Sequence, residues 1–153
     1  MSVTTEQLER FLRKVDVLFP VPLSQKQDLH LFAEKLSEKA TICAQLIQGE
    51  IVALAAGYTD NVMENRGYLS VVATLPEAQG NGYASELIRR FLAIAAQKHL
   101  DAVHLYADRS NAPALAMYRR LGFVEWKMPN EPRESDVHFI FEFAKEKEEC
   151  MYY

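Results

Sequence analysis

The chain has 153 residues, of which 49% are apolar and 25% are charged, and its net charge is −4. This ordinary globular balance excludes collagen, a long coiled coil and general disorder, and it predicts a single domain over residues 1–153. The sequence contains no membrane-spanning apolar run, no signal-peptide pattern and no basic field suited to nucleic acid. We therefore expect a cytoplasmic protein that binds neither nucleic acid nor a membrane.

Two amphipathic helices are predicted in the first 38 residues. Apolar residues recur at helical spacing in both, namely Leu8, Phe11, Leu12 and Val15, then Leu29, Phe32, Ala33 and Leu36. Thr4 or Thr5 can cap the first helix, and Pro20 and Pro22 end its pattern. We expect Ser24 to cap the second helix. The apolar loop 19–23 between them is either a wall of a binding site or a packed connector.

A β-hairpin and a third strand are predicted next. Residues 40–47 and 51–59 are apolar and partly β-branched, and the intervening Gln-Gly-Glu is typical of a hairpin turn. Residues 59–67 are polar and predict a loop. Residues 68–74 then form a strand that ends before a proline.

The pattern changes to a strand–helix–strand unit over residues 68–107. Apolar residues at helical spacing predict a helix over 82–97, and residues 102–107 read as a short strand. Such a unit pairs its two strands in parallel through a right-handed crossover. A helix at about 111–120 should end at Gly122 as a C-cap glycine.

The last third is predicted to add two strands. Residues 123–127 form one, residues 128–136 a loop, and residues 137–143 alternate as a final strand. The charged tail 145–153 ends in Tyr152 and Tyr153, which are either frayed or a contact for a second copy in a homodimer.

The most informative local feature is the glycine turn of residues 79–84, Gln-Gly-Asn-Gly-Tyr-Ala, between a strand and a helix. Glycines let a ligand approach the backbone closely, and the free amides of a helix N-terminus attract phosphate. The glycines could equally make a tight turn that Asn81 caps. The spacing is neither a P-loop nor G-x-G-x-x-G, which disfavours P-loop nucleotide hydrolases and Rossmann dehydrogenases.

Two motifs together carry a resemblance to a known family. The turn fits Q/R-x-x-G-x-G/A, and residues 111–123 read N-A-P-A-L-A-M-Y-R-R-L-G-F. At this separation they resemble the GNAT superfamily of acetyl-CoA-dependent N-acetyltransferases, in particular small single-domain members of bacterial type. The resemblance covers about residues 40–143, with an acetyl-CoA-binding core at 68–126. It implies an α/β fold with a mixed, mostly antiparallel sheet of about six strands, a splayed parallel β-α-β unit, two N-terminal helices and two further helices.

The resemblance also implies a site for acetyl-CoA. Its residues would be Val72, Ala73, Thr74, Gln79, Gly80, Asn81, Gly82, Tyr83, Ala84 and Asn111. The backbone of residues 72–74 would pair with the pantetheine arm, the amides of residues 80–84 would hold the pyrophosphate, and Gln79 would order that loop. No metal is expected, because Cys43 and Cys150 form no zinc pattern.

Tyr118 is the predicted general acid, which the resemblance implies would protonate the departing thiolate. Asn111 and Tyr118 are seven residues apart, so they share one helix face. A phenol, with a pKa of about 10, can donate a proton to a thiolate. The alternative is a core aromatic whose hydroxyl bonds a carbonyl, while Asn111 is also an ordinary helix cap.

The general base stays open at this point. Some members of the superfamily carry a glutamate near the start of the third strand, where this chain has Tyr68 and Ser70. Asp60 and Glu64 in the preceding loop are the named candidates, and both are also normal in a solvated loop. The other groups that could take the proton are Asp108, His30, His104, His138 and water.

The sequence thus predicts an N-acetyltransferase that moves acetyl from acetyl-CoA to a primary amine by direct attack in a ternary complex. A small acceptor, such as an amino sugar, polyamine or antibiotic, is favoured over a protein because the acidic chain offers no evident docking patch for a histone-like substrate. The alternatives are a non-catalytic acyl-CoA-binding sensor or assembly module, and an enzyme that uses a different acyl donor.

Overall fold

A computed structural model describes residues 3–127 and 135–144. Within this part of the chain the α-helices are α1 (Thr5–Val15), α2 (Leu29–Lys39), α3 (Tyr83–Gln97) and α4 (Ala112–Leu121). The strands are β1 (Thr41–Ile47), β2 (Glu50–Tyr58), β3 (Arg66–Thr74), β4 (Ala102–Asp108), β5 (Val124–Glu125) and β6 (Asp136–Glu142). Short 3-10 turns are η1 (Asp16–Leu18), η2 (Leu23–Gln25), η3 (Met63–Asn65) and η4 (Pro76–Ala78). The six strands and four helices confirm the predicted α/β fold.

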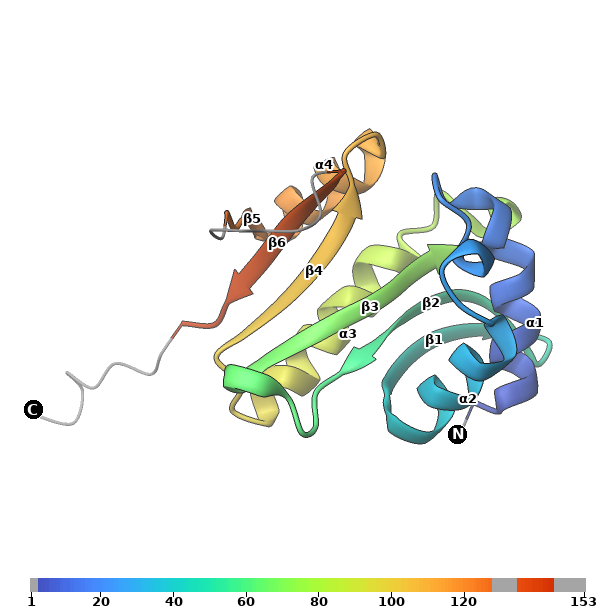
Figure 1. Cartoon of the computed structure of the whole chain (residues 1–153), viewed down its shortest axis with the longest axis horizontal. Helices are drawn as coiled ribbons and strands as arrows, with labels where there is room; N and C mark the ends of the chain where they lie inside the picture. The colour runs from blue at the N-terminus through green and yellow to red at the C-terminus, as the bar shows by residue number, and fades with distance from the viewer. Residues whose placement is uncertain (1–2, 128–134, 145–153) are drawn as a thin grey trace, which may run out of the picture.

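One mixed sheet carries all six described strands in the order β1-β2-β3-β4-β6-β5 (Figure 1). Only β3 and β4 pair in parallel among them, and the other neighbouring pairs are antiparallel. The helix α3 forms the crossover between β3 and β4, as the strand–helix–strand pattern predicted.

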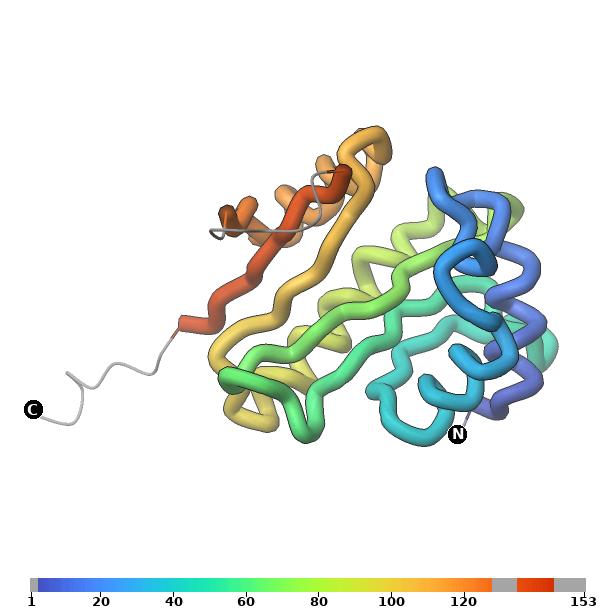
Figure 2. Tube along the Cα trace, in the orientation of Figure 1, coloured from blue at the N-terminus to red at the C-terminus, as the bar shows by residue number. Residues whose placement is uncertain are grey.

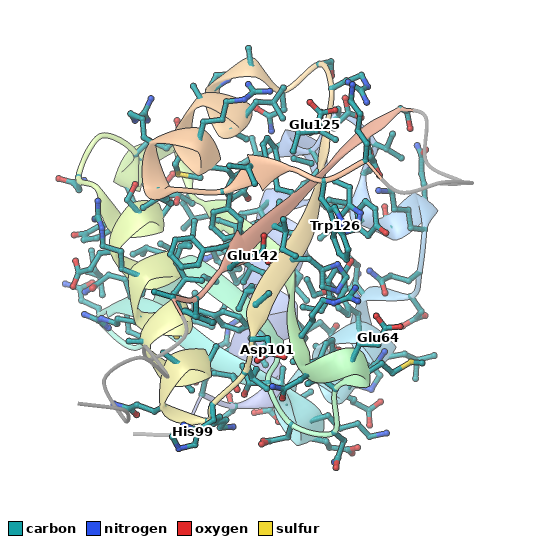
Figure 3. All side chains as sticks on the ribbon, turned by 90° about the vertical axis from the view of Figure 1, so that its left-hand side faces the viewer. Glu64, His99, Asp101, Glu125, Trp126 and Glu142 are labelled. Carbon is teal, nitrogen blue, oxygen red and sulfur yellow. The ribbon has the colours of Figure 1, made fainter. Side chains whose placement is uncertain are left out.

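Two hydrophobic cores lie on opposite faces of the sheet. Helices α1 and α2 cover the face that carries Leu54 and Val71, whereas α3 and α4 lie on the face that carries Leu69 and Leu105. Figure 3 views the molecule with α3 and α4 on one side and the N-terminal helices on the other. Because both faces of β2 are covered, residues 51–57 are all buried.

The N-terminal helices begin at side-chain caps. Thr4 forms a capping box with Gln7, which confirms the first predicted cap. The predicted Ser24 cap is wrong, because Asp28 caps α2 by accepting a hydrogen bond from the Leu31 amide at 2.9 Å. Ser24 lies in η2 instead and donates its hydroxyl to the Asp16 carboxylate. A carboxylate one residue before the helix outcompetes a hydroxyl four residues further upstream.

The hairpin between β1 and β2 turns on two residues with left-handed backbone. Gln48 has φ +52° and Gly49 has φ +78°, which is the backbone that two-residue hairpins require. The strands therefore begin and end within one residue of the predicted bounds.

The parallel strands β3 and β4 separate soon after they begin. Their pairing covers only Arg66–Tyr68 against Ala102–His104. Figure 2 shows β3 and β4 close together at their N-terminal ends and far apart at their C-terminal ends. The splay predicted from the family resemblance is present. It is open at the C-terminal ends of β3 and β4, which lead on to α3 and α4.

A β-bulge in β3 lies just beyond the last paired residues. Gly57 of β2 pairs with Leu69, but its neighbour Ala56 pairs with Val71, so Ser70 is the extra residue. The bulge turns Leu69 and Val71 to opposite faces of the sheet. Its close approach needs a glycine on β2, because a Cβ on Gly57 would lie 2.0 Å from the Tyr68 carbonyl oxygen.

Some sequence predictions fall outside the described residues. They concern Cys150, most of the loop 128–136, and the tail 145–153 with its predicted homodimer contact. Cys43 is buried in β1, as its apolar surroundings predicted. No helix in the described ranges is long and apolar enough to cross a membrane.

Candidate active site

A cavity of about 560 Å³ occupies the space between the separated strands. Residues 68–72 of β3 form one wall and residues 105–108 of β4 form the other. Asn111 and Tyr118 of the α4 segment also line it, together with Phe19, Pro20, Val21 and Leu23 of the apolar loop 19–23. The fold therefore brings Val72, Asn111 and Tyr118 to one cavity, although they are up to 46 residues apart in sequence.

Free backbone amides gather in the turn between β3, which forms one wall of this cavity, and α3. Gly80 has φ +86° and Gly82, which precedes α3, has φ +76°. No described residue accepts a hydrogen bond from the amides of residues 80–85. Consecutive unsatisfied amides at a helix N-terminus form a concave site for an anion, and the helix dipole adds to the attraction. Nothing lies within 4 Å of a Cβ built on Gly80 or Gly82, so ligand space is open there.

Two side chains hold the turn in shape. The Gln79 amide nitrogen Nε2 donates to the Thr74 carbonyl at 3.4 Å, and Asn81 Nδ2 donates to the Ala78 carbonyl at 2.9 Å. The Gln79 bond joins the turn to the end of β3 and the Asn81 bond closes the turn itself, while the predicted role of Gln79 in an acetyl-CoA site stays a prediction. Ala73 and Thr74 lie on β3 beyond the cavity wall, and Tyr83 and Ala84 are half-buried in the first turn of α3.

Tyr118 reaches the cavity from α4 through a tightly packed setting. Its side chain is 7% exposed and its ring packs edge-on against Phe123, with centroids 5.7 Å apart. Burial raises the pKa of the Tyr118 phenol well above its ordinary value, so the hydroxyl stays protonated. No described residue forms a hydrogen bond with this hydroxyl, so the carbonyl partner weighed in the alternative interpretation is not found there.

Asn111 does act as the helix cap. Its side-chain oxygen accepts a hydrogen bond from the Ala114 amide at 3.4 Å, and Gly122 ends α4 with φ +107°. The cap role does not remove Asn111 from the cavity wall, so its predicted contact with acetyl-CoA stays a prediction.

A second cavity of about 770 Å³ adjoins the first on the α2 side of the sheet. The two cavities share Lys35, Tyr58, Tyr68 and Tyr106. The charged residues that line the second cavity are of both signs, namely Lys35, Glu38, Lys39, Asp60 and Arg66. Three of these five residues are cations and two are acids, so the second cavity is not an acidic site for a cationic amine. The buried Tyr58 hydroxyl lacks a hydrogen-bond partner among the described residues, so it can bond a ligand that enters here.

The named base candidates Asp60 and Glu64 are both engaged in ion pairs. Asp60 lines the second cavity but contacts Lys98 Nζ at 2.9 Å, and Glu64 pairs with Arg66 and lies outside both cavities. Figure 3 shows Glu64 at the edge of the molecule, on the same side of the sheet as Trp126.

The other candidate proton acceptors divide by position. Asp108 lines the first cavity and accepts hydrogen bonds from Ser110, which lower its pKa. His30 pairs with Glu9 outside both cavities. The structure brings His104 and His138 together, which no sequence pattern signalled.

Comparison with known proteins decides the family. The sequence model of the acetyltransferase (GNAT) family matches residues 8–123. This chain belongs to the GNAT family. Among solved structures, the PaiA N-acetyltransferase of Thermoplasma acidophilum, in complex with coenzyme A, matches this GNAT chain with a TM-score of 0.72. That match has 14% identity and covers 94% of this chain and 97% of the other.

Two curated relatives of this GNAT chain are named as different acetyltransferases. It is 44% identical over 62 residues to the mycothiol acetyltransferase of Pseudarthrobacter chlorophenolicus, which is 40% of this chain and 19% of that protein. It is 39% identical over 62 residues to N-alpha-acetyltransferase MAK3 of Arabidopsis thaliana, or 40% of this chain and 33% of the relative. The chain thus spans a third or less of the length of these two relatives. Family and fold are confirmed, and the individual site roles stay predictions.

The described ranges contain no group of three or more His, Cys, Asp or Glu side chains that could hold a metal ion.

Proposed function

We propose that this GNAT member transfers an acetyl group from acetyl-CoA to the primary amine of a small-molecule acceptor, by direct attack in a ternary complex. The observation that carries the proposal is the row of unsatisfied amides at residues 80–85. They follow β3, the strand that forms one wall of the cavity lined by Tyr118. These amides would hold the pyrophosphate of the donor.

The edge of β3 suits the pantetheine arm of acetyl-CoA. Beyond Tyr68, the side of β3 that faces β4 pairs with no described strand, so its backbone groups are available to a ligand. A ligand with amide groups can add to such an edge as an extra strand does. Acetyl-CoA would supply the activated acetyl group next to the splay, where Val72 and Leu105 form the walls.

Tyr118 is suited to donating a proton and unsuited to accepting one. Its raised pKa keeps the phenol protonated across the neutral range. The hydroxyl would protonate the sulfur as the C–S bond breaks and the amine nitrogen bonds the carbonyl carbon. Cys43 does not compete as a covalent nucleophile, because it is buried in β1 and burial raises the pKa of its thiol.

The dimensions of the second cavity favour a small acceptor. Its volume of about 770 Å³ lies within the range of small-molecule sites. This chain is similar to a mycothiol acetyltransferase, which is named for a thiol, and also to an N-alpha-acetyltransferase. The two names point to different kinds of acceptor. The acceptor screen therefore includes amino sugars, polyamines and short peptides with free N-termini.

Calorimetric titration tests donor binding. We expect acetyl-CoA and CoA to bind and ATP to bind weakly, and Gly82→Val to abolish CoA binding because a side chain would occupy the pyrophosphate space. The matched control is Gly49→Val, since Gly49 has nearly the same φ and equally open surroundings but lies in the β1–β2 turn. Failure of wild type to bind either CoA species would refute the proposal.

Turnover separates an enzyme from a sensor. With an accepted amine, Tyr118→Phe should lower kcat by about 10²- to 10⁴-fold while acetyl-CoA affinity is retained. Binding of acetyl-CoA without acetylation of any amine in the screen would instead support the non-catalytic alternative.

A further inference from the structure

We propose that His104 accepts the proton of the attacking amine and passes it to His138. This inference rests on the proposed function and assigns the proton acceptor that the sequence left open. It is built on the hydrogen bond between His104 Nδ1 and His138 Nε2, whose atoms are 2.9 Å apart.

His104 occupies the apex of the splay. It faces Tyr68 in the last residue pair that joins β3 to β4, and the strands separate immediately beyond it. Its side chain lines the second cavity, where the acceptor would enter. The first cavity, which would hold the donor, begins at the same Tyr68. An amine in the second cavity would thus lie next to His104, where the second cavity meets the first cavity that would hold the donor.

Acid and base then reach the reaction from opposite faces of the sheet. Leu105 belongs to the core on the α3 and α4 face, and Tyr118 belongs to the same core. Neighbouring residues on a strand point to opposite faces, so His104 points to the α2 face. Tyr118 and His104 therefore cannot exchange a proton directly. Tyr118 thus stays protonated while His104 accepts the amine proton.

The histidine pair can move one proton by two steps. In the required tautomer, His104 Nδ1–H donates to His138 Nε2, and His104 Nε2 carries the lone pair. As the amine nitrogen bonds the acetyl carbon, its proton transfers to His104 Nε2, and the Nδ1 proton moves to His138. The C–S bond breaks, and the sulfur takes the Tyr118 proton. The product amide and CoA are neutral at the reacting atoms, while His138 is left protonated and Tyr118 deprotonated. Water then takes the proton from His138 and supplies one to Tyr118.

His138 is a well-held proton acceptor. It is 5% exposed and its ring stacks on Tyr106, with centroids 4.2 Å apart and planes 16° from parallel. The Trp126 ring lies 4.9 Å away and can stabilise a cationic imidazolium by its π face. Arg66, whose guanidinium lies over the same Trp126, has its charge paired by Glu64.

The charged and titratable groups around the pair come from several elements. Among the described residues they include Lys35, Glu38 and Lys39 of α2, Asp60 of the loop after β2, Arg66 and Tyr68 of β3, and Tyr106 of β4. The apparent pKa values in a rate profile belong to this coupled set and not to one residue.

The pH dependence of kcat/KM tests the proposal, with a primary amine accepted by wild type. Wild type should show an acidic limb on which the rate falls as the histidine pair becomes protonated. His104→Gln should lower kcat/KM by about 10²- to 10⁴-fold at neutral pH and remove that limb, with calorimetric acetyl-CoA affinity unchanged. The control His30→Gln, which lies outside both cavities, should keep the rate and the limb.

Chemical rescue distinguishes a catalytic role of His104 from a purely structural one. Imidazole added to His104→Ala should restore part of the rate, and His138→Gln should retain more activity than His104→Gln, because only the second step is lost. An active His104→Gln that keeps the acidic limb would overturn the proposal while leaving the acetyltransferase function intact. A wild type that acetylates no amine would overturn both. If His104→Gln unfolds, the imidazole rescue of His104→Ala decides the question, and its absence counts against the proposal.

Discussion

Replacing Gly57 with alanine should disturb the β-bulge on which the splay depends. The added Cβ would lie 2.0 Å from the Tyr68 carbonyl oxygen and 2.8 Å from Leu69 Cα, and real Cβ contacts stay above 3.0 Å. Because both neighbours are backbone atoms, β3 itself must move by about 1 Å, and a misplacement of this size can cost on the order of 100-fold in rate. Forcing atoms into a packed core also lowers the free energy of unfolding by about 1–3 kcal/mol.

Urea denaturation and steady-state acetylation measure the two effects of Gly57→Ala. Gly49→Ala is the control, because its Cβ meets nothing within 4 Å and only its positive φ is strained. The control should lose about 1–2 kcal/mol of unfolding free energy and no activity. If Gly57→Ala keeps wild-type stability and kcat, then the contact with Tyr68 does not set the geometry of the bulge and our reasoning fails.

Three further predictions concern stability. Thr4→Ala removes the α1 capping box and should lower the free energy of unfolding by about 1 kcal/mol in urea denaturation. Phe139→Ala, at a fully buried position beneath α4, should cost about 3–5 kcal/mol by the same assay. The His30–Glu9 pair raises the pKa of His30 and lowers that of Glu9. Its stabilisation is therefore greatest between about pH 4.5 and 6.5, so the Tm loss in His30→Gln should shrink toward pH 8, and a pH-independent loss would contradict this.

Local patterns in the sequence predicted most of the fold. Helical spacing located α1 to α3 because each of these helices buries one apolar face, and Gly122 marked the end of α4. The Gln48–Gly49 turn located the first hairpin. The glycine turn and the residue 111–123 motif indicated the family, since a ligand that binds backbone requires residue types at fixed spacing. These features are readable because each depends on neighbours close in sequence.

The bulge and the histidine pair could not be predicted so directly. The pairing of His104 with His138 depends on strand register, which brings residues 34 apart in sequence together. The engagement of Asp60 by Lys98 likewise joins residues 38 apart. Gly57 did carry a signal, because an isolated glycine inside a strand often marks a bulge or a close backbone approach.

The short pairing between β3 and β4 also bears on how ligands affect the folded protein. Only three residue pairs join the two halves of the sheet, and α3 and α4 bridge them on one face. A molecule seated between the separated strands would contact both halves at once and add contacts where the sheet has none. The bound ligand would then hold the two halves of the sheet together. At a concentration 100 times its Kd it would add about 2.7 kcal/mol to the free energy of unfolding. Such a protein would resist heat and proteolysis more as the ligand level rises, and its added stability would grow with the logarithm of the free ligand concentration.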